Sequence, residues 1–395
     1  MKVIILHSEL GRLRGGGENF TRNLFTAFAA RGHDVTAAFF ADRHAQYPLR
    51  LPPHIKPMPI PGWWSVNIGQ TTLASVGSYI SAEGRMKKFL DRIQQGISWR
   101  NIQWQRRRFQ RRIKSEFGAR WDGFDAAYVH SNIFLASTIA GHLPTVLRLP
   151  GPVEAEFAPV LRSVPAVCAN GDALASIREF LGDHATELPI GIDTRIFKPG
   201  PSSIRSALGW TSEHRVVGYV GRLTHLKGVD LLASAFREMS LASSSLRLLI
   251  VGSGTEETRM RGLLAKELAQ GLVHIEGDVD HSRLAEWYRA IDLFLMPSRY
   301  ENFSNAVLEA MACGIPFLAS DVGGNKIFAK TGAGWLFQPD SVSSLCARLG
   351  TIAENPLEIK VRGEIAARYA RDCYDWSVSA ERLERIISSR LGVQR

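Results

Sequence analysis

The chain has 395 residues, which exceeds the size at which one hydrophobic core usually stops growing, so two domains are expected. A hydrophobic content of 45% and a charged content of 22% are typical of a soluble globular protein. The formal net charge of +10 implies an anionic partner. The four cysteines lie far apart without a Cys-x-x-Cys pair, which argues against a disulfide framework or a zinc site and fits a reducing cytoplasm.

The first apolar run, residues 1–6, is too short for a signal peptide because His7 and Glu9 follow at once, and it predicts a strand. The stretch 126–147 carries no Lys, Arg, Asp or Glu. It nevertheless contains two histidines and a proline, and its pattern favours strand, helix and strand over one long span. We therefore expect no transmembrane helix.

The first half opens as strand, glycine-rich turn, helix and strand, over 3–6, 11–17, 18–31 and 35–40. This is how a doubly wound nucleotide-binding domain begins, although the Gly-x-Gly-x-x-Gly fingerprint of a dinucleotide site is missing. Further along we expect an extended proline-rich loop over 49–61, a basic helix over 85–117, strands over 124–129, 145–149 and 166–169, and a helix over 172–181.

The stretch 189–201 has linker composition, and the alternation of strand and helix begins again after it. Strands are expected over 216–220, 246–251, 273–276, 291–296, 317–320 and 334–337, helices over 229–239, 258–269 and 283–290, and an amphipathic helix over 374–391. Such alternation predicts parallel sheets with helices on both faces. The expected fold class is α/β, with two Rossmann-like doubly wound domains facing each other across a cleft. We place them at 1–190 and 191–372, with 373–395 as a helix that packs back toward the first.

Two carboxylates frame a helix start in the segment 296–314, which reads as strand, loop and helix. Glu301 lies before the helix and Glu309 one to two turns inside it, while Ser304 and Asn305 between them are good N-cap residues. Free N–H groups at a helix start favour a phosphate, and a carboxylate can accept hydrogen bonds from two sugar hydroxyls. The segment fits a diphosphate with a ribose and a second sugar, or, alternatively, carries two solvated acids.

Two cations follow another strand. Arg222 and Lys227 both lie in the loop after the strand 216–220, at the edge where doubly wound folds bind ligands. Together they could neutralise a diphosphate, arginine through a bidentate contact and lysine as a point charge. Either one alone would more readily be interpreted as a solvated surface charge.

These motifs together resemble the retaining GT-B glycosyltransferases of family 4, also called group 1. The resemblance covers almost the whole chain and is strongest in the second half. Its motifs are Gly15-Gly16-Gly17-Glu18, Gly221-Arg222 with Lys227-Gly228, Val251-Gly252-Ser253-Gly254, Pro297 to Glu301, Glu309 to Pro316, and Asp321-Val322-Gly323-Gly324.

The resemblance implies a role for each matching position in the second half. Glu309 resembles the glutamate that binds the ribose, and Glu301 the acid that meets the hydroxyls of the donor sugar. Arg222 and Lys227 resemble the pair that binds the diphosphate and compensates the charge of the leaving group. The backbone near Val279 would meet the base.

Further roles are implied at the helix start and in the first domain. The N–H groups around Ser304 and Asn305 would assist at the diphosphate. Gly16 and Gly17 would close over the phosphates from the first domain.

His130 resembles the first-domain histidine near the reacting centre, but the family's His-x-His pattern is His130-Ser131-Asn132 here. Either His130 or Asn132 can therefore occupy that place, and His130 can also simply cap a buried strand. Arg148 stands where a histidine is common, and Asn302-Phe303-Ser304-Asn305 replaces a glycine-containing segment, which should narrow the space near the donor sugar.

No metal or other cofactor is expected, with the nucleotide diphosphate sugar acting as the donor substrate. Asp278-Val279-Asp280 matches an Asp-x-Asp pattern of metal-dependent transferases, but they have a different fold. The cationic pair can replace a metal ion at the diphosphate.

The charge of the chain is concentrated in one segment. From 85 to 120 there are twelve basic and two acidic residues, a surplus equal to the net charge of the whole chain. A solvated helix is the default interpretation of this segment. Because tryptophans are interleaved with arginines there, attachment to anionic lipid is the favoured functional interpretation, and nucleic acid is a poor candidate. The residues assigned to the membrane or acceptor are Arg106, Arg107, Arg108, Arg111 and Arg112.

The expected function is transfer of a hexose from a UDP-sugar or GDP-mannose to an acceptor hydroxyl, with a lipid-linked glycan of bacterial cell-surface polysaccharide synthesis as the acceptor. The enzyme would be cytoplasmic and peripheral on the inner face of the cell membrane. The alternatives are a nucleotide-sugar epimerase on the same fold and a non-catalytic membrane-binding protein.

Overall fold

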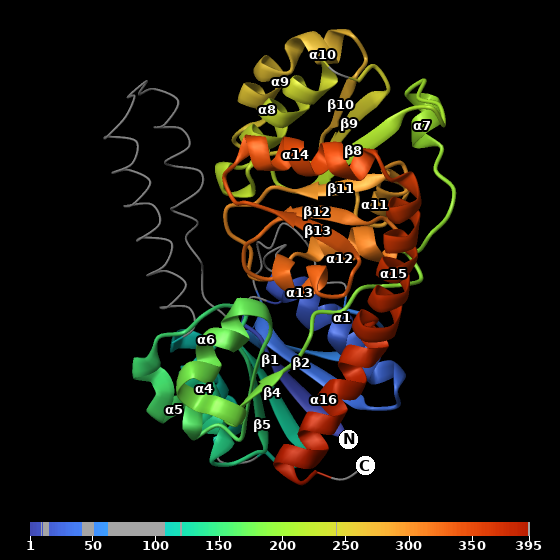
Figure 1. The fold of residues 1–395 in the computed structure, drawn as a ribbon. Coiled ribbons are helices and arrows are strands. Elements are labelled where there is room, and N and C mark those ends of the chain that lie inside the picture. The colour runs from blue at the N-terminus through green and yellow to red at the C-terminus, as the bar shows by residue number, and fades with distance from the viewer. Residues whose placement is uncertain are drawn as a thin grey trace, which may run out of the picture. The chain divides into compact units, whose positions relative to one another are not determined.

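A computed structural model describes residues 1–8, 10, 16–41, 51–61, 107–118, 121–241 and 243–393. The chain forms two compact units (Figure 1). The N-terminal unit comprises Met1–Ala169, Ile177–Leu188 and Ala380–Arg395, and the C-terminal unit comprises Asn170–Ser176 and Pro189–Ser379. The chain stays in the C-terminal unit from Pro189 to Ser379, and residues from 380 onward belong to the N-terminal unit.

The N-terminal unit is built on a parallel sheet of seven strands in the order β3-β2-β1-β4-β5-β6-β7. Its strands are β1 (Lys2–Leu6), β2 (Asp34–Ala41), β3 (Ile55–Pro61), β4 (Ala126–His130), β5 (Thr145–Arg148), β6 (Ala166–Ala169) and β7 (Ala185–Glu187). The central strands β1, β4, β5 and β6 consist almost entirely of buried residues, as expected for a parallel sheet covered on both faces.

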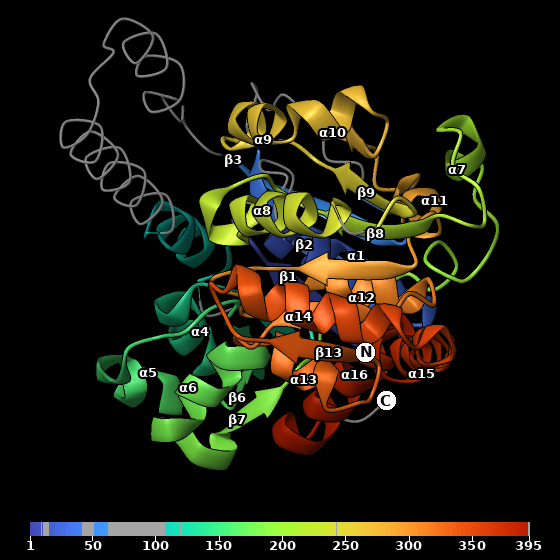
Figure 2. The same ribbon diagram turned by 45° about the horizontal axis from the view of Figure 1, so that its top comes forward.

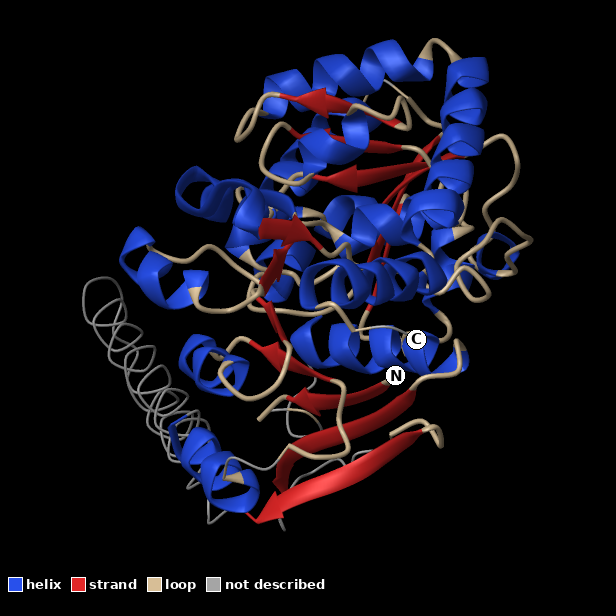
Figure 3. Cartoon of the chain, turned by 90° about the horizontal axis from the view of Figure 1, so that it is seen from below, coloured by secondary structure: helices blue, strands red, loops and turns tan. Residues whose placement is uncertain are grey.

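The helices α1 (Gly16–Ala30), α4 (Ile133–Ala140) and α5 (Ala158–Arg162) and the short 3-10 turns η1 (Ala155–Phe157) and η2 (Gly182–His184) belong to the same unit, and Figure 3 distinguishes helices from strands by colour. Two more helices, α6 (Gly171–Leu181) and α16 (Trp376–Leu391), begin with residues of the C-terminal unit and end with residues of the N-terminal unit. A further helix is described over 107–117 and is held by Phe109 and Ile113, which are buried.

The prediction of a loop over 49–61 is wrong for its second part, which is the edge strand β3. Proline lacks an N–H and is tolerated in a sheet only where no ladder bond is lost. Pro57, Pro59 and Pro61 alternate along β3, so in a parallel strand their missing donors all lie on one side. The alternation puts that side at the free edge, and the residues between the prolines can pair with β2.

The C-terminal unit contains a second parallel sheet, of six strands in the order β10-β9-β8-β11-β12-β13. Its strands are β8 (Arg215–Val220), β9 (Leu246–Val251), β10 (Val273–Glu276), β11 (Leu293–Met296), β12 (Phe317–Ser320) and β13 (Gly334–Phe337). Its helices are α7 (Ile204–Ala207), α8 (Val229–Ser240), α9 (Glu257–Leu263), α10 (Ala265–Ala269), α11 (Leu284–Tyr288), α12 (Asn305–Ala312), α13 (Asn325–Ala329), α14 (Val342–Ala353) and α15 (Pro356–Tyr374), with the 3-10 turn η3 (His225–Lys227).

Several helices of this unit differ from expectation. The single helix expected over 258–269 is broken into α9 and α10, which lie end to end in Figure 2, because the backbone at Leu264 leaves the helical region. No residue range was predicted from the sequence for α7, α13, α14 and α15. Among the described residues, no helix has the length and apolar character needed to cross a membrane.

Candidate active site

The segment between β11 and α12 has the local structure that its sequence predicts. Ser304 is the N-cap residue of α12, and its hydroxyl accepts a hydrogen bond from the Val307 N–H at 3.3 Å. The helix ends before Gly314, which takes the left-handed conformation with φ 81°. Glu301 therefore lies in the loop, Glu309 lies inside the helix, and Asn305 is its first, exposed residue.

Lys227 and Glu301 are brought together from the ends of β8 and β11, which are neighbouring strands. The ammonium Nζ of Lys227 is 2.5 Å from Oε2 of Glu301, and the side chains are only 19% and 10% exposed. The Ser298 hydroxyl donates a second hydrogen bond to the same oxygen at 3.3 Å. An ammonium has three donors, so Lys227 can hold this carboxylate and still donate to a phosphate oxygen.

Glu309 is oriented by two side chains that precede it along the chain. The Tyr288 hydroxyl donates to Oε2 of Glu309 at 2.7 Å, and Nε2 of His281 is 3.3 Å from Oε1. Burial, with the carboxylate of Glu309 as a second cause, raises the pKa of Tyr288 well above its usual value. Tyr288 thus remains a neutral donor that fixes one carboxylate oxygen, and the other oxygen lies beside the half-exposed His281.

Arg222 is exposed in the turn after β8. The hydroxyl of the buried Tyr219 donates to the Arg222 carbonyl at 2.8 Å and fixes that turn. Burial raises the pKa of Tyr219, and Glu301 acts in the same direction while Arg222 opposes it. Both Glu301 and Arg222 are therefore electrostatic neighbours of one tyrosine at the carboxyl end of β8.

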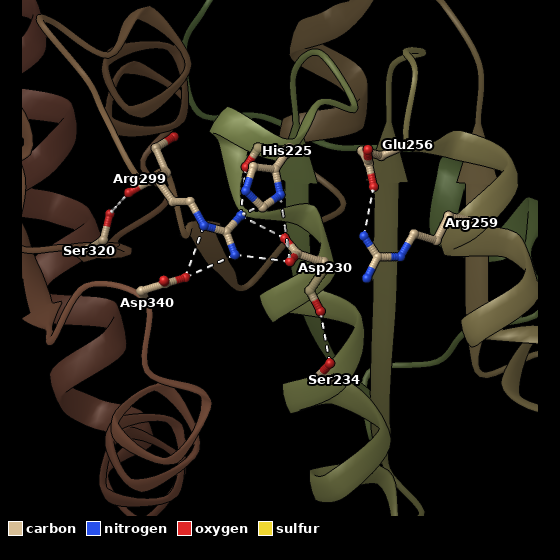
Figure 4. Close-up of polar contacts among 9 residues, drawn as sticks. His225, Asp230, Ser234, Glu256, Arg259, Arg299, Ser320 and Asp340 are labelled. Carbon is tan, nitrogen blue, oxygen red and sulfur yellow. Dashed lines mark hydrogen bonds and ion pairs between the residues drawn. The ribbon is translucent and has the colours of Figure 1, made fainter. Parts of the chain in front are cut away.

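Arg299 fixes the two loops against each other, as Figure 4 shows. Its guanidinium donates to both carboxylate oxygens of Asp230 at 2.8 and 2.9 Å, to Asp340 at 2.9 Å and to the carbonyl of His225 at 2.6 Å. Burial alone would favour the neutral carboxyl, but the hydrogen bonds and charge of Arg299 lower the pKa of Asp230. Because His225 lies two residues before Lys227, and Arg299 two before Glu301, this cluster positions both site residues.

Val279, expected near the base, lies in the loop after β10 and packs partly buried against the core. Its neighbour Asp278 accepts a hydrogen bond from the Ser253 hydroxyl at 2.8 Å, which ties the loops after β9 and β10 together.

In the N-terminal unit, the structure brings Gly17 and His130 together. Gly16 is the first residue of α1, and a Cβ at Gly17 would lie 2.8 Å from Nε2 of His130, so any other residue there would require the imidazole ring to shift. Ser131 has a positive φ of 57°, an uncommon backbone conformation that accompanies functional sites in many proteins.

Asn132 has an evident structural task, since its Oδ1 accepts from the Leu135 N–H at 3.1 Å and caps α4. Its part in catalysis stays a prediction. Arg148 is buried with its guanidinium over the ring of Phe20 at 4.7 Å, and burial lowers its pKa.

The basic residues on the helix 107–117 are on its solvent side. Arg107, Arg111 and Arg112 are exposed and Arg108 is partly buried, while Arg106 lies outside the described residues. These positions are consistent with a basic surface, and their contact with a membrane or acceptor stays a prediction.

Several residues that shape the site were not identified from the sequence, namely Tyr288, His281 and Arg299. Tyr288 and His281 contact Glu309 from 21 and 28 positions away in the sequence. Arg299 lies in the same short loop as Glu301, and this position was the only signal available in the sequence.

Comparison with known proteins is decisive for the C-terminal unit. Residues 202–371 match the family described as glycosyl transferases group 1. This segment is a group 1 glycosyltransferase domain. The domain contains Arg222, Lys227, Val279, Glu301 and Glu309, so every side chain of the C-terminal site belongs to it.

Curated relatives of the group 1 domain act on varied substrates. The chain is 30% identical over 220 residues to a D-inositol 3-phosphate glycosyltransferase of Thermobispora bispora, covering 53% of this chain and 51% of that protein. It is 29% identical over 229 residues to a GDP-mannose-dependent monoacylated alpha-(1-6)-phosphatidylinositol monomannoside mannosyltransferase of Corynebacterium glutamicum, covering 55% of this chain and 60% of that protein. The matches thus span little more than half of these relatives.

Solved structures share the fold over the whole chain. Sucrose-phosphate synthase from Thermosynechococcus elongatus has a TM-score of 0.75 at 19% identity, with 100% of both chains covered. Anabaena HepE in complex with UDP-glucose has a TM-score of 0.65 at 19% identity, covering 98% of this chain and 100% of that one. The predicted GT-B fold class, with its two Rossmann-like domains, and the resemblance to group 1 glycosyltransferases are confirmed.

Proposed function

We propose that the chain is a retaining glycosyltransferase of family 4 that needs no metal ion and transfers a hexose from a UDP-sugar or GDP-mannose to an acceptor hydroxyl. The observation that carries the proposal is the partly buried pair of Lys227 and Glu301, 2.5 Å apart, in the loops that precede α8 and α12 of a group 1 domain. A cation for the diphosphate and a carboxylate for sugar hydroxyls are thereby held at one place.

The remaining site residues of the C-terminal unit fit the other parts of such a donor. The N–H groups at the start of α12, around Ser304 and Asn305, offer an electropositive site for phosphate. Glu309 is held in place by Tyr288, and its second oxygen is suited to ribose hydroxyls. Arg222 would add a second positive charge at the diphosphate.

The proposed reaction is a front-face displacement. The bond from the acceptor oxygen to the anomeric carbon forms on the side from which the diphosphate leaves, so the configuration is retained. The departing phosphate oxygen takes the acceptor proton. Lys227 and Arg222 stabilise the negative charge that develops on that phosphate, which is the task a metal ion performs in other transferases.

The proposed acceptor is a lipid-linked glycan of bacterial cell-surface polysaccharide synthesis, reached at the inner face of the cell membrane. Two relatives support a lipid or surface-glycan acceptor: the mannosyltransferase of Corynebacterium glutamicum named above, and a lipopolysaccharide core mannosyltransferase of Rhizobium meliloti that is 32% identical over 172 residues. The exposed basic residues of the helix 107–117 would meet the anionic membrane surface.

A donor panel combined with two substitutions tests the function. UDP-glucose, UDP-galactose and GDP-mannose are screened by thermal shift, because a bound ligand raises the melting temperature, and then assayed with lipid-linked acceptors. With the best donor, Glu309→Ala and Lys227→Ala are expected to lose most of the turnover while their folded structure persists.

The matched controls are Glu276→Ala, at the end of β10, and Lys266→Ala on α10, both in the same unit. They should retain full activity. Turnover in Glu309→Ala or Lys227→Ala equal to that of the controls would refute the assigned site. If the enzyme instead interconverts a sugar nucleotide in the absence of any acceptor, its reaction is epimerisation and not transfer.

A further inference from the structure

Glu301 places a negative charge in the part of the site that is proposed to bind a diphosphate. Nζ of Lys227 is 2.5 Å from its Oε2, and the hydroxyl of Ser298 donates a hydrogen bond to the same oxygen at 3.3 Å. Glu301 is 8% exposed and Ser298 is fully buried. Both contacts are donors, which suits an ionised carboxylate. The charge of Lys227, which should attract the diphosphate, is therefore partly offset by its own partner.

The distance between Glu301 and a bound phosphate follows from their shared contact. A phosphate oxygen that accepts a hydrogen bond from Nζ of Lys227 lies about 2.8 Å from that nitrogen. Oε2 of Glu301 is 2.5 Å from the same nitrogen, so the two oxygens are separated by about 5 Å at most. The side chain of Glu301 is 10% exposed, so water screens its charge only in part. Glu301 thus repels the phosphate that Lys227 binds.

The nucleotide that the proposed reaction consumes and the one that it releases differ in charge at this phosphate. In a nucleotide sugar, the β-phosphate is esterified to the sugar and has only one ionisable oxygen. In the nucleoside diphosphate that remains after transfer, the β-phosphate is terminal, and because its second pKa is about 6 it carries nearly one negative charge more at neutral pH. Lys227, Arg222 and the first N–H groups of α12 attract this additional charge, whereas Glu301 repels it.

We propose that Glu301 selects between the two nucleotides by charge, because its carboxylate weakens the binding of the spent nucleoside diphosphate relative to that of the nucleotide sugar. Lys227 and Ser298 both contact Oε2, so Oε1 is the oxygen assigned to hydroxyls of the donor sugar. The inference deepens the proposed function and rests on it for the position of the diphosphate at Lys227. It gives the carboxylate a task beyond recognition of the sugar, namely to promote the exchange of product for donor.

A neutral side chain at this position distinguishes the proposed role of Glu301 from two simpler ones. Glutamine has the same shape, and its amide oxygen can still accept the hydrogen bonds of Lys227 and Ser298. If Glu301 bound only sugar hydroxyls, Glu301→Gln would leave the affinity for a nucleoside diphosphate unchanged. If Glu301 mainly held Lys227 in place, that affinity would fall. Repulsion by charge predicts that the affinity rises.

The affinities are measured on the full chain by isothermal titration calorimetry with UDP, GDP and the β-methyl ester of each, and the base that binds more tightly is used. The ester has the charge of a nucleotide sugar but no sugar hydroxyls. We expect Glu301→Gln to raise the affinity for the nucleoside diphosphate about tenfold more than that for the ester, since the two ligands differ by one charge near Glu301. In transfer assays, inhibition by the nucleoside diphosphate should become stronger in the variant.

Two variants serve as controls for charge and for local geometry. Glu354→Gln removes the same charge from an exposed position at the end of α14, and Ser298→Ala removes a hydrogen bond from Oε2 of Glu301 without changing its charge. Both should keep the preference between diphosphate and ester within about twofold of that of the unaltered chain. Thermal unfolding shows whether each variant is folded, and Glu301→Ala replaces Glu301→Gln as the neutral variant if the latter is not.

The outcomes separate this inference from the proposed function. An unchanged or lower affinity for the nucleoside diphosphate in a folded neutral variant overturns the inference, as does an equal gain for diphosphate and ester. A Ser298→Ala variant that behaves like Glu301→Gln also overturns it, because geometry and not charge would then be the cause. If the unaltered chain binds none of the four nucleotides, the donor site of the proposed function fails, and this result is obtained without any variant.

Discussion

Gly228 shows how a single residue can set the position of a site loop. It follows Lys227, has a φ of +66° and joins η3 to α8. A Cβ there would lie 1.9 Å from the carbonyl oxygen of Pro297, in the loop that leads to Glu301. The close approach of these two loops, and with it the contact between Lys227 and Glu301, therefore requires glycine at this position.

Substitution of Gly228 by alanine should destabilise the C-terminal unit by about 3 kcal/mol or more, since overpacking adds to the cost of a left-handed alanine. Gly209→Ala is the matched control, because Gly209 has a φ of +71° but no atom within 4 Å of its Cβ position. The control should lose only about 1 kcal/mol, or about 2–4 °C in melting temperature for a unit of this size. Equal losses in thermal unfolding would contradict a steric role for Gly228.

At the residue scale, the sequence predicts site residues whose relative positions follow from their spacing along the chain. Glu301, Ser304 and Glu309 share one loop and helix, so their spacing already places them around a helix start. The partners that orient them are set by tertiary folding. Nothing in the local sequence of Tyr288 indicates that its hydroxyl meets Glu309, because that contact depends on how α11 packs beside α12.

At the scale of elements, Arg299 connects the loop after β11 with the start of α8 and with the loop after β13 (Figure 4). The planar guanidinium donates hydrogen bonds to both carboxylate oxygens of Asp230 and to Asp340. An ammonium cannot reproduce this forked geometry. The partners in turn raise the pKa of Arg299, first of all through the hydrogen bonds to Asp230.

Arg299→Lys should therefore keep the charge but lose the fork, and loosen the loops that carry Lys227 and Glu301. We expect kcat/KM to fall about tenfold, corresponding to the loss of one or two hydrogen bonds. Arg259→Lys is the control, because Arg259 makes a single contact of 3.3 Å to Glu256 with its side chain 62% exposed. The measurement is kcat/KM of both variants by steady-state kinetics. Equal values would show that the forked contact of Arg299 is dispensable.

Elements were predicted correctly where the alternation of strand and helix was clear. The prediction failed where proline content and strand pattern indicated different structures. The alternation of buried strands and helices identified the parallel sheets. In β3, proline was taken as a sign of a loop, although Pro57 and Pro59 are compatible with an edge strand that pairs on one side only. An edge position is a property of the sheet order, which the segment itself does not encode.

At the scale of the whole molecule, the net charge of +10 is not spread evenly. On the described helix 107–117, Phe109 and Ile113 face the core, and the ring of Phe109 packs against Phe40 of β2 with centroids 5.0 Å apart. Arg107 and Arg111 point to solvent. The helix is thus anchored to the N-terminal sheet by one side and presents a basic surface on the other.

This arrangement predicts salt-sensitive binding to anionic membranes. Each basic residue near an anionic surface contributes about 1 kcal/mol, so reversing Arg107, Arg111 and Lys114 to glutamate should weaken binding by about a hundredfold or more at low salt. Binding is measured by co-sedimentation with vesicles containing phosphatidylglycerol, and with phosphatidylcholine vesicles as the neutral reference. Added salt should release the unaltered protein, because it screens exposed charges.

A second triple variant distinguishes the effect of the local basic surface on membrane binding from the effect of the overall net charge. Lys360, Arg368 and Arg371 are exposed on α15 of the C-terminal unit, and their reversal to glutamate changes the net charge by the same amount. If the helix 107–117 meets the membrane, this variant should bind nearly as well as the unaltered protein. Equal weakening in both triple variants would assign the attraction to overall charge, and binding that ignores ionic strength would exclude an electrostatic mechanism altogether.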